Sequence, residues 1–355
     1  MSSKVFVLFI GVASILVGAI ATGLLRWYAV KLDVVDRPTD RSSHEIPTPR
    51  GGGLSLVVVF VCLLITLFAG AEIPGRHFAA LLAGSLLVSG IGFVDDHRHV
   101  AASYRFFVHV LAAVLAVFLV GGLPPLPIGA MAVDLSWAGD VLAVVFLVWL
   151  TNLYNFMDGI DGIAAVETIF VAGAAAAIAY TGDTHFILVL EIGIAAACIG
   201  FLIWNWPPAK IFMGDVGSGF VGFALGALAI VSAQQGLLPI WTWLILAGVF
   251  VADATVTVIR RMARGERWYE AHRSHAYQRL ARRHGNHRSV TLLVCAVNVA
   301  WLLPIAAASA SWPDLGWMLT IIAWLPLLVA AAFLGAGLPD EKPITATDSQ
   351  RQNTL

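Results

Sequence analysis

Residues 185–204 read HFILVLEIGIAAACIGFLIW, and Glu191 is the only Asp, Glu, Lys or Arg in this stretch. An α-helix rises about 1.5 Å per residue, so the stretch is long enough to cross the ~30 Å hydrocarbon core of a bilayer. It lacks the alternation of polar and apolar residues that a membrane-spanning strand requires. The stretch therefore predicts a transmembrane α-helix.

Similar apolar stretches recur along the chain. Of its 355 residues, 59% are hydrophobic and 12% are charged, a composition that no water-soluble core of this length requires. The predicted spans are 4–25, 53–70, 77–94, 104–121, 138–151, 163–180, 185–204, 217–233, 239–259, 289–309 and 314–335. The fifth is short, which leaves a count of ten open. We predict an all-α, polytopic membrane bundle of about eleven helices.

The positions of Lys and Arg predict how the bundle is oriented, because these residues collect on the cytoplasmic side of short loops. If the loops alternate sides, nineteen of the 21 Lys and Arg residues fall on one side, and only Lys4 and Arg76 on the other. This predicts an external amino terminus and a cytoplasmic carboxyl terminus. We expect one membrane domain, 1–335, followed by a polar, disordered tail, 336–355. Its cytoplasmic loops would be 26–52, 95–103, 152–162, 205–216 and 260–288.

Carboxylates gather on this predicted cytoplasmic side. Asp95 and Asp96 close the third span, where acids oppose the helix macrodipole, so the pair indicates cation or phosphate chemistry. After the fifth span, amide and carboxyl groups recur every three residues, and neighbouring pairs would share a helix face. These groups belong to Asn152, Asn155, Asp158 and Asp161.

Two further segments carry groups suited to phosphate. Asp215 lies in the glycine-rich segment 211–219 at the start of the eighth span, and helix amino termini bind anions. A capping role would explain the aspartate but not the glycines around it. His272 and His275 lie in an Arg-rich loop and lack a nearby third His or a Cys for zinc, so phosphate binding fits them better. Arg50, before three glycines, would form a second phosphate-facing wall.

Four ionisable residues lie within predicted spans and leave two interpretations open. His109, Glu167, Glu191 and Asp253 could serve function or could be packed internally by hydrogen bonds. A transporter is the main alternative class, and it predicts polar groups near the midplane and on both faces. The carboxylate segments instead gather on one side, which favours a catalytic site that holds a divalent cation and neutralises phosphate oxygens.

The sequence resembles the polyprenyl-phosphate N-acetylhexosamine-1-phosphate transferases. These belong to glycosyltransferase family 4 and are related to phospho-N-acetylmuramoyl-pentapeptide transferase. The resemblance covers nearly all the spans and rests on four segments in the family's order, 92–96, 155–162, 212–218 and 272–275. The His-Arg-Ser-His spacing is similar to the O-antigen initiating branch. It differs from the three consecutive histidines of the muramyl-pentapeptide branch.

The resemblance implies a reaction. Undecaprenyl phosphate would attack the β-phosphate of a UDP-N-acetylhexosamine and release UMP, with Mg²⁺ or Mn²⁺ required. This step would begin a cell-surface polysaccharide such as O-antigen, at the cytoplasmic face of a bacterial inner membrane. Which N-acetylhexosamine is transferred stays open, as does a homodimer, and no nucleic-acid partner is expected.

The resemblance also implies residue roles. Asp215 would bind the metal, and one of Asp95 and Asp96 would act on the lipid phosphate as base or nucleophile. Asn155, Asp158 and Asp161 would bind the nucleotide and metal-linked phosphate. His272 and His275 would contact the diphosphate or the nucleotide. Asn205 and Phe212 would contact uridine, the phenyl ring by stacking. Further candidates for substrate binding are Arg50, Asn152 and Arg273.

Overall fold

The computed structural model describes residues 3–38, 46–180, 185–267 and 272–339, and this part of the chain is a bundle of helices. The first helices are α1 (Ser3–Lys31), α2 (Leu54–Ala69), α3 (Gly75–His97), α4 (Ala102–Val120), α5 (Ser136–Met157), α6 (Ile163–Ala179) and α7 (Phe186–Asn205). The later ones are α8 (Asp215–Gln234), α9 (Ile240–Leu246), α10 (Gly248–Ala263), α11 (Ala276–His284), α12 (His287–Val297), α13 (Leu303–Ser311) and α14 (Gly316–Phe333). A π-helical turn (Asn298–Leu302) joins α12 to α13, and a 3₁₀ turn (Pro313–Leu315) precedes α14.

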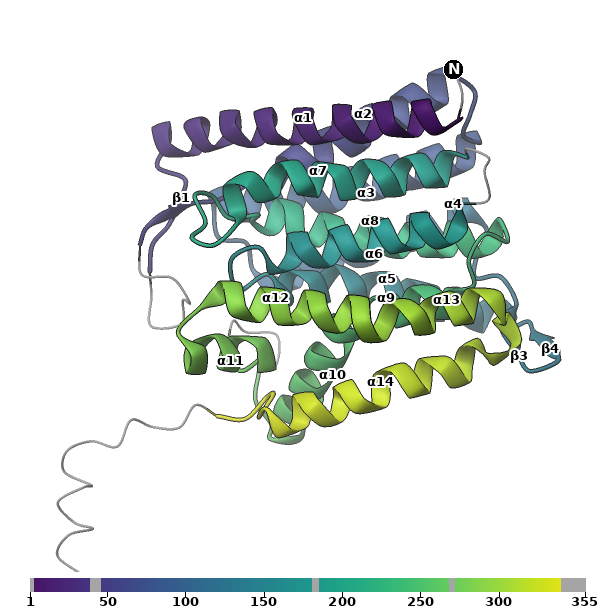
Figure 1. The fold of residues 1–355 in the computed structure, drawn as a ribbon. Helices are drawn as coiled ribbons and strands as arrows, with labels where there is room; N and C mark the ends of the chain where they lie inside the picture. Colours follow the sequence, from purple (N-terminus) through teal and green to yellow (C-terminus); the bar gives the residue numbers. More distant parts are fainter. Residues whose placement is uncertain (1–2, 39–45, 181–184, 268–271, 340–355) are drawn as a thin grey trace, which may run out of the picture.

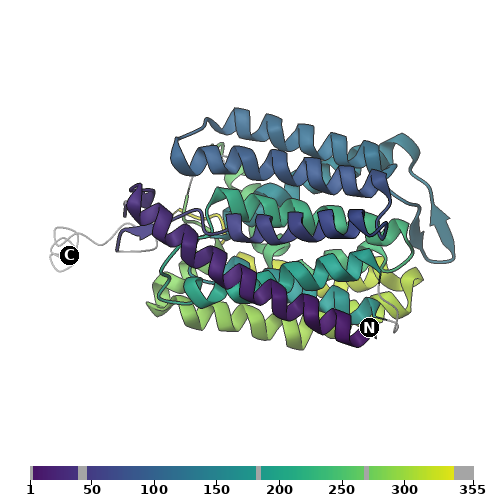
Figure 2. The ribbon, with the colours of Figure 1, turned by 90° about the horizontal axis from the view of Figure 1, so that it is seen from above.

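Two antiparallel pairs of short strands mark opposite ends of the bundle. Strand β1 (Val35–Asp36) pairs with β2 (Thr48–Pro49), and β3 (Leu126–Ile128) pairs with β4 (Met131–Val133). Figure 1 shows β1 and α11 at one end of the long helices, with β3 and β4 at the other. Seen from above, α1 begins at the end that carries the β3–β4 hairpin (Figure 2).

Helix α8 forms the centre of the bundle. Every residue from Val216 to Ser232 is buried, and α8 packs against α3 and α5. A helix that is apolar on all sides needs neighbours on all sides, so α8 is surrounded while α1 and α14 lie at the periphery. The buried helix carries Asp215 at its first residue, and its packing therefore fixes that carboxylate in the molecule.

The outer surface of the bundle is apolar, as expected for a protein in a lipid solvent. Phe118 is 80% exposed and Phe333 is 87% exposed, and large hydrophobic side chains of α1 point outward along its length. Soluble monomers rarely expose contiguous apolar surface on this scale. The chain is thus a polytopic membrane protein, which confirms the predicted class.

Each predicted span coincides with a helix or a helix pair, but their lengths differ. In the described part of the chain, eight helical stretches are long and apolar enough to cross a membrane, and the bent pair α9 and α10 makes a ninth. Helices α2 and α6 are apolar but shorter, with 16 and 17 residues. The fifth span, predicted over 138–151, is longer in the structure and extends over 22 residues.

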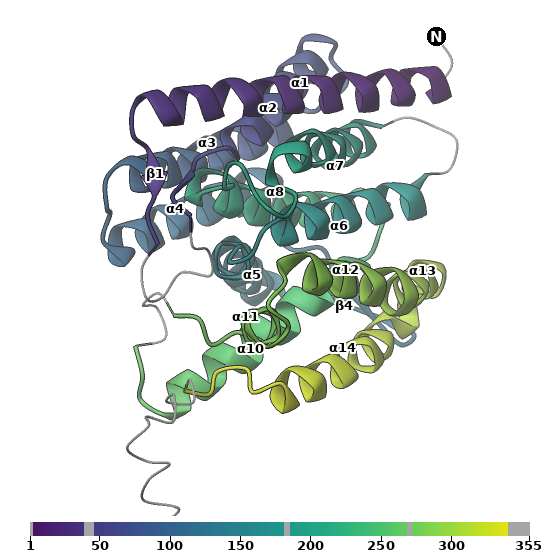
Figure 3. The same ribbon diagram turned by 60° about the vertical axis from the view of Figure 1, so that its left-hand side comes forward.

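The predicted span 239–259 is not one continuous helix. It divides at Ala247, and α9 and α10 meet at an angle of 75°. A break in a span frees backbone carbonyls, which need new partners in lipid. The indole of Trp324 donates to the carbonyl of Leu244 at 2.9 Å and satisfies one of them. The break turns α10 away from the bundle axis toward α11 (Figure 3).

The start of the predicted tail is packed against the bundle. Ala336 is fully buried, and Arg260 donates to its carbonyl, while Arg279 donates to the carbonyls of Leu338 and Pro339. Residues 336–339 therefore belong to the packed domain. Residues 340–355 lie outside the described part of the chain, and so do 39–45 and 268–271 of the predicted cytoplasmic loops.

Candidate active site

Helix ends bring the predicted carboxylates together at the α11 end of the bundle. Asp95 and Asp96 lie in the last turn of α3, Asp158 follows the last residue of α5, and Asp215 begins α8. Their helices pack against one another, so segments more than a hundred residues apart meet at one point. The structure thus assembles the acidic cluster from three of the four segments that the sequence singled out.

The carboxylate of Asp96 binds the amino terminus of α8. Its two oxygens accept hydrogen bonds from the backbone N–H groups of Asp215, at 3.0 Å, and Val216, at 3.1 Å. Asp96 is 2% exposed, and its negative charge suits the positive end of the α8 dipole. The expectation that these N–H groups bind a phosphate is therefore wrong, because a protein carboxylate already occupies them.

Gly214 makes this arrangement sterically feasible. Its backbone has φ +75° and ψ 168°, a region that essentially only glycine adopts. A β-carbon at this position would lie 2.5 Å from Oδ2 of Asp96 and 2.8 Å from the backbone nitrogen of Gly51. The glycine thus allows Asp96 to approach the start of α8.

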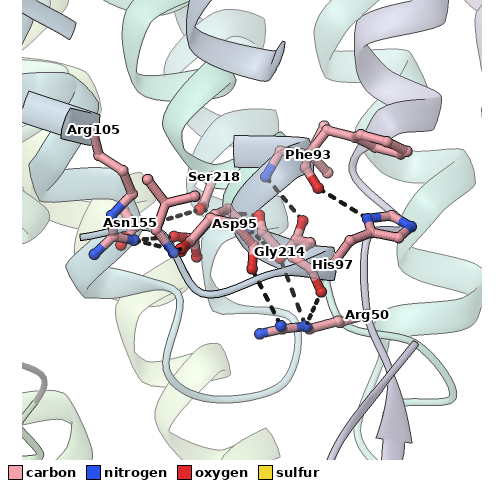
Figure 4. Close-up of polar contacts among 12 residues, drawn as sticks. Arg50, Phe93, Asp95, His97, Arg105, Asn155, Gly214 and Ser218 are labelled. Atoms are coloured by element: carbon pink, nitrogen blue, oxygen red, sulfur yellow. Dashed lines mark hydrogen bonds and ion pairs between the residues drawn. The ribbon is translucent and has the colours of Figure 1, made fainter. Parts of the chain in front are cut away.

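Arg105 connects two of the carboxylates. Its Nη1 lies 2.7 Å from Oδ2 of Asp95 and also donates to Oδ2 of Asp215 (Figure 4). The other oxygen of Asp95 accepts the backbone N–H of Val100 at 2.7 Å. A single guanidinium therefore neutralises part of the charge of Asp95 and Asp215, between α3, α4 and α8.

Arg50 and Asn155 complete the polar shell that Figure 4 shows. Arg50 donates through Nε to the backbone carbonyl of Asp96 at 2.8 Å and through Nη2 to that of Asp95 at 3.3 Å. Asn155 donates to the hydroxyl of Ser218, in the first turn of α8, at 3.1 Å. Asn152 does not join them, since its amide donates to the carbonyl of Val148 in its own helix.

Asp158 and Asp161 lie on a turn, not on a shared helix face. Helix α5 ends at Met157, and Gly162 has φ +76°, so the predicted helical spacing is wrong beyond Asn155. In the described residues, no hydrogen bond or ion pair to the carboxylate of Asp158 is found. Burial raises the pKa of Asp158 well above its ordinary value, and the nearby charges of Asp215, Asp96 and Asp161 raise it further. This carboxylate has the strongest electrostatic need for a cation.

Asp161 connects its turn to the 205–214 loop and to α12 by hydrogen bonds and a contact with His287. Its carboxylate accepts the backbone N–H of Ala209 at 3.0 Å and lies 3.4 Å from Nδ1 of His287. Its backbone carbonyl accepts the hydroxyl of Thr291 at 3.1 Å. These contacts hold the 205–214 loop and α12 against the turn, and the predicted substrate contact of Asp161 stays a prediction.

Asn205 and Phe212, the predicted uridine contacts, border the same loop. Asn205 is 3% exposed, and its amide accepts from the N–H of Gly162 at 3.0 Å and donates to the carbonyl of Ile211 at 2.9 Å. Phe212 is half-buried, and its backbone N–H donates to the carbonyl of Pro49 at 2.8 Å. The amide of Asn205 is thus engaged within the protein, whereas Phe212 as a residue is only half-buried.

We expect Asn205→Ala to destabilise the protein. Each of its two buried partners would lose its hydrogen bond, and a buried unsatisfied group costs about 1–3 kcal/mol. The free energy of unfolding in detergent should therefore fall by about 3 kcal/mol. Asn152→Ala is the matched control, because its amide contacts its own helix, and a smaller loss is expected. Unchanged stability with a raised KM for the nucleotide sugar would instead favour a direct uridine contact.

The two loop histidines form a stacked pair. The rings of His272 and His275 have centroids 4.9 Å apart and planes inclined by 23°. Nδ1 of His272 lies 3.0 Å from the hydroxyl of Ser274 and accepts its backbone N–H at 3.4 Å. Burial, together with the charges of His275 and Arg261, lowers the pKa of His272 to about 3. His272 is therefore neutral at physiological pH, and its Nε2 carries the proton.

The histidine loop contacts the turn that carries Asp158. The hydroxyl of Tyr277 donates to the carbonyl of Phe156 at 3.0 Å. A β-carbon on Gly159 would collide with this hydroxyl and would lie 2.7 Å from Nε2 of Gln278. The first turn of α11 therefore packs directly on the acidic turn. Arg273 lies half-buried between the histidines and accepts a hydrogen bond from Arg282 through its carbonyl.

The ionisable residues inside the spans have different environments. Glu167 accepts the amide of Asn298 at 2.6 Å, whereas Nδ1 of His109 has no hydrogen-bond partner among the described residues. Neither oxygen of Glu191 has a hydrogen-bond partner within the described ranges. Asp253 differs from these three, because its carboxylate reaches the amino terminus of α11. Of the four, only Asp253 is thus connected to the candidate site by a direct hydrogen bond to the histidine loop.

The donor set fits a magnesium ion that shares its coordination with substrate. Among the described residues, no three His, Cys, Asp or Glu side chains form a complete metal-binding group. Mg²⁺ usually takes one or two carboxylates and completes its octahedral shell with waters and substrate phosphates. Asp158, which lacks a protein partner in the described chain, and the partly exposed Asp215 supply such carboxylates.

Sequence reasoning assigned no site role to Arg105, Ser218 or Tyr277. Arg105 follows Asp95 by ten residues and lies in the first turn of α4, so the α3–α4 hairpin returns it to the acidic pair. A basic residue at the start of the next span was a detectable signal for this contact. No sequence signal indicated the contacts of the Ser218 and Tyr277 hydroxyls, because these contacts depend on packing between distant helices.

The model of glycosyl transferase family 4 matches residues 78–233. The chain is 27% identical to a probable undecaprenyl-phosphate N-acetylglucosaminyl 1-phosphate transferase of Bacillus subtilis, over 93% of this chain and 92% of the relative. It is 29% identical to a decaprenyl-phosphate N-acetylglucosaminephosphotransferase of Mycobacterium leprae, over 85% and 82%. It is 30% identical to a phospho-N-acetylmuramoyl-pentapeptide-transferase of Pelagibacter ubique, over 63% and 69%.

Proposed function

This chain belongs to glycosyl transferase family 4, and we propose that it transfers N-acetylglucosamine 1-phosphate from UDP-N-acetylglucosamine to undecaprenyl phosphate. The observation that carries the proposal is the cluster of Asp95, Asp158 and Asp215 with Arg105 at one end of a membrane bundle. Such a cluster suits two anionic phosphates, one soluble and one anchored in the bilayer. The names of the relatives support both the sugar and the polyprenyl acceptor.

The reaction is a phosphoryl-type displacement. An oxygen of the lipid phosphate forms a bond to the β-phosphorus of the nucleotide sugar. The bond between that phosphorus and the bridging oxygen to the α-phosphate breaks, and UMP leaves with the electron pair. The products are UMP and a lipid diphosphate that carries the sugar. Catalysis of such steps rests mainly on positioning and on neutralising charge.

The site residues divide these tasks. Asp95 is the member of the acidic pair that faces Arg105 and Asp215, so it would accept a proton from the lipid phosphate. Asp96 would position α8 by its two backbone hydrogen bonds. The basic groups Arg50 and Arg105 would attract phosphate oxygens. His272 would donate from Nε2 to the diphosphate or the nucleotide.

Mg²⁺, or Mn²⁺ in its place, would be held by Asp215 and Asp158. When bound, the ion neutralises the diphosphate and the leaving UMP. Asn155 donates to Ser218, three residues after Asp215, and from there it would help to orient the Asp215 carboxylate. The family assignment supports a metal requirement.

We also propose how many times the chain crosses the membrane and on which side the site lies. Counting α2 and α6 as spans and α9 with α10 as one gives eleven crossings, which preserves the alternation of the basic loops. The site would then face the cytoplasm at a bacterial inner membrane, where UDP-sugars are made. The product would begin a cell-surface polysaccharide such as O-antigen.

The proposal is tested with purified protein, undecaprenyl phosphate and a panel of UDP-N-acetylhexosamines. UMP and lipid-linked product should appear with UDP-N-acetylglucosamine, and should stop on addition of EDTA and return with Mg²⁺. Folded protein that gives neither product with any donor would contradict the proposal. Flux measurements would then test the transporter alternative, which the gathering of carboxylates at one end of the bundle does not favour.

Asp158→Asn is expected to raise the Mg²⁺ concentration needed for half-maximal turnover by about 10–100-fold. The change removes a carboxylate whose ionised form needs a cation, because burial and the neighbouring carboxylates raise its pKa. Mn²⁺ binding followed by electron paramagnetic resonance should weaken by a similar factor. Asp134→Asn, at the opposite end of the bundle, is the control. An unaltered metal dependence would remove Asp158 from the metal site.

A further inference from the structure

We propose that Asp253 is a positioning residue, which orients the histidine pair His272 and His275 through a hydrogen bond to His275 Nδ1. The inference rests on the proposed function, because the histidines matter only if they contact the substrate. Asp253 lies on α10, the half of the broken span that turns toward α11 (Figure 3). Neither the sequence pattern nor the printed names of the relatives assigns it a role.

The carboxylate of Asp253 accepts four hydrogen bonds. Oδ1 accepts the backbone N–H of Ala276 at 2.9 Å and the hydroxyl of Thr257 at 3.1 Å, and lies 3.2 Å from Nδ1 of His275. Oδ2 accepts the backbone N–H of Tyr277 at 2.9 Å. One buried carboxylate therefore holds the amino terminus of α11 and the imidazole together. A carboxylate within a membrane span is costly unless it is so paired.

The contact fixes the protonation of the His275 ring. A carboxylate can only accept, so we assign a ring proton to Nδ1, and Nε2 is then the ring nitrogen that has no protein partner. His275 is 1% exposed, and its Nε2 has no hydrogen-bond partner among the described residues. A buried ring nitrogen without a partner is costly, which indicates that a ligand or a bound water completes it.

The orientation passes from His275 to His272 by stacking. The two rings are 4.9 Å apart at their centroids, and Ser274 holds Nδ1 of His272, so Nε2–H of His272 is directed away from the loop backbone. Stacking on a ring that Asp253 holds restricts the more exposed His272. The acid on α10 would thus set the geometry of both imidazoles without touching the substrate.

A double-mutant cycle tests the proposal. Turnover is measured for the wild type, Asp253→Asn, His275→Gln and the double variant, with thermal unfolding for each. Asp253→Asn should lower turnover about 30-fold in the wild-type background and less than about 2-fold beside His275→Gln, because coupled groups are not additive. A full 30-fold loss in both backgrounds would overturn the proposal and leave Asp253 a purely structural role in α11.

Thr257→Val is the matched control. It removes a hydrogen bond to the same carboxylate oxygen but leaves the contact with His275, so turnover should change less than about 3-fold. Asp253→Glu keeps the charge and displaces the carboxylate. If Asp253→Asn does not fold, Asp253→Glu takes its place in the double-mutant cycle. It should again lower turnover strongly in the wild-type background and only slightly beside His275→Gln.

An NMR spectrum tests the contact between Asp253 and His275 independently of the proposed function. Histidine labelled with ¹⁵N gives ring-nitrogen resonances, and comparison with His275→Gln identifies those of residue 275. The proposal predicts a protonated Nδ1 that shifts in Asp253→Asn, whether or not the protein turns over UDP-sugars. An unshifted resonance would overturn the contact, whereas an inactive wild type with the predicted shift would contradict only the proposed function.

Discussion

Replacing Asp215 with asparagine is expected to lower turnover about 1,000-fold. Asp215 is the first residue of the buried helix α8, and its carboxylate lies at the contact of Arg105 with Asp95. Asparagine keeps the shape of the side chain but removes the charge that, in the proposed mechanism, would hold a cation beside the diphosphate. The loss should therefore appear in kcat, measured as UMP release, and Mn²⁺ binding should weaken with it.

Asp140→Asn is the control for this loss of charge. Asp140 is exposed at the opposite end of the bundle and accepts the N–H of Leu123 at 3.3 Å, so turnover should stay within about 2-fold of the wild type. If Asp215→Asn retained a tenth or more of the wild-type turnover, Asp215 could not be the principal metal ligand. The assignment would then pass to Asp158.

Gly214→Ala should be the most destabilising single change at the site. Its φ of +75° with ψ of 168° is strained for alanine by about 1–3 kcal/mol, and the new methyl group would meet Asp96 and Gly51 as well. We expect the free energy of unfolding to fall by about 4 kcal/mol in all. Turnover of the folded fraction should fall about 100-fold, because Asp215 would move with its helix.

Gly236→Ala is the control that separates the effect of backbone strain from the effect of the methyl collision. Gly236 has φ +68°, and a β-carbon there would have no atom within 4 Å, so it reports backbone strain without the collision. We expect a loss of about 1 kcal/mol and normal turnover for this variant. Thermal unfolding measures both variants. If Gly214→Ala and Gly236→Ala both lowered stability by about 1 kcal/mol, the close contact of Asp96 with the amino terminus of α8 would be contradicted.

Much of the fold could be predicted from apolar length alone. A run such as 185–204 can satisfy its backbone in lipid only as a helix, and α7 covers Phe186–Asn205. The position of the site also followed from the sequence, because Asp95, Asp158 and Asp215 all lie where an apolar run begins or ends. Helix ends on the same side of a bundle share one face, and these three lie close together because α3 and α5 both pack against α8.

The contacts within the site could not be predicted in the same way. Whether Asp96 or a phosphate occupies the N–H groups of α8 depends on the packing of α3, which local spacing does not encode. The break at Ala247 has no proline to mark it, so a single span was the natural expectation. The interpretation of Asp253 depended on that break, because only a turned α10 lets its carboxylate reach α11.

The fate of the β-phosphate tests the central claim most directly. UDP-N-acetylglucosamine labelled with ³²P at the β-phosphate would be incubated with the purified protein, Mg²⁺ and undecaprenyl phosphate. The proposed displacement predicts that the label enters the lipid fraction in equal amount to the UMP released. Label that remains with released UDP would show transfer of the sugar without its phosphate, and would contradict the account.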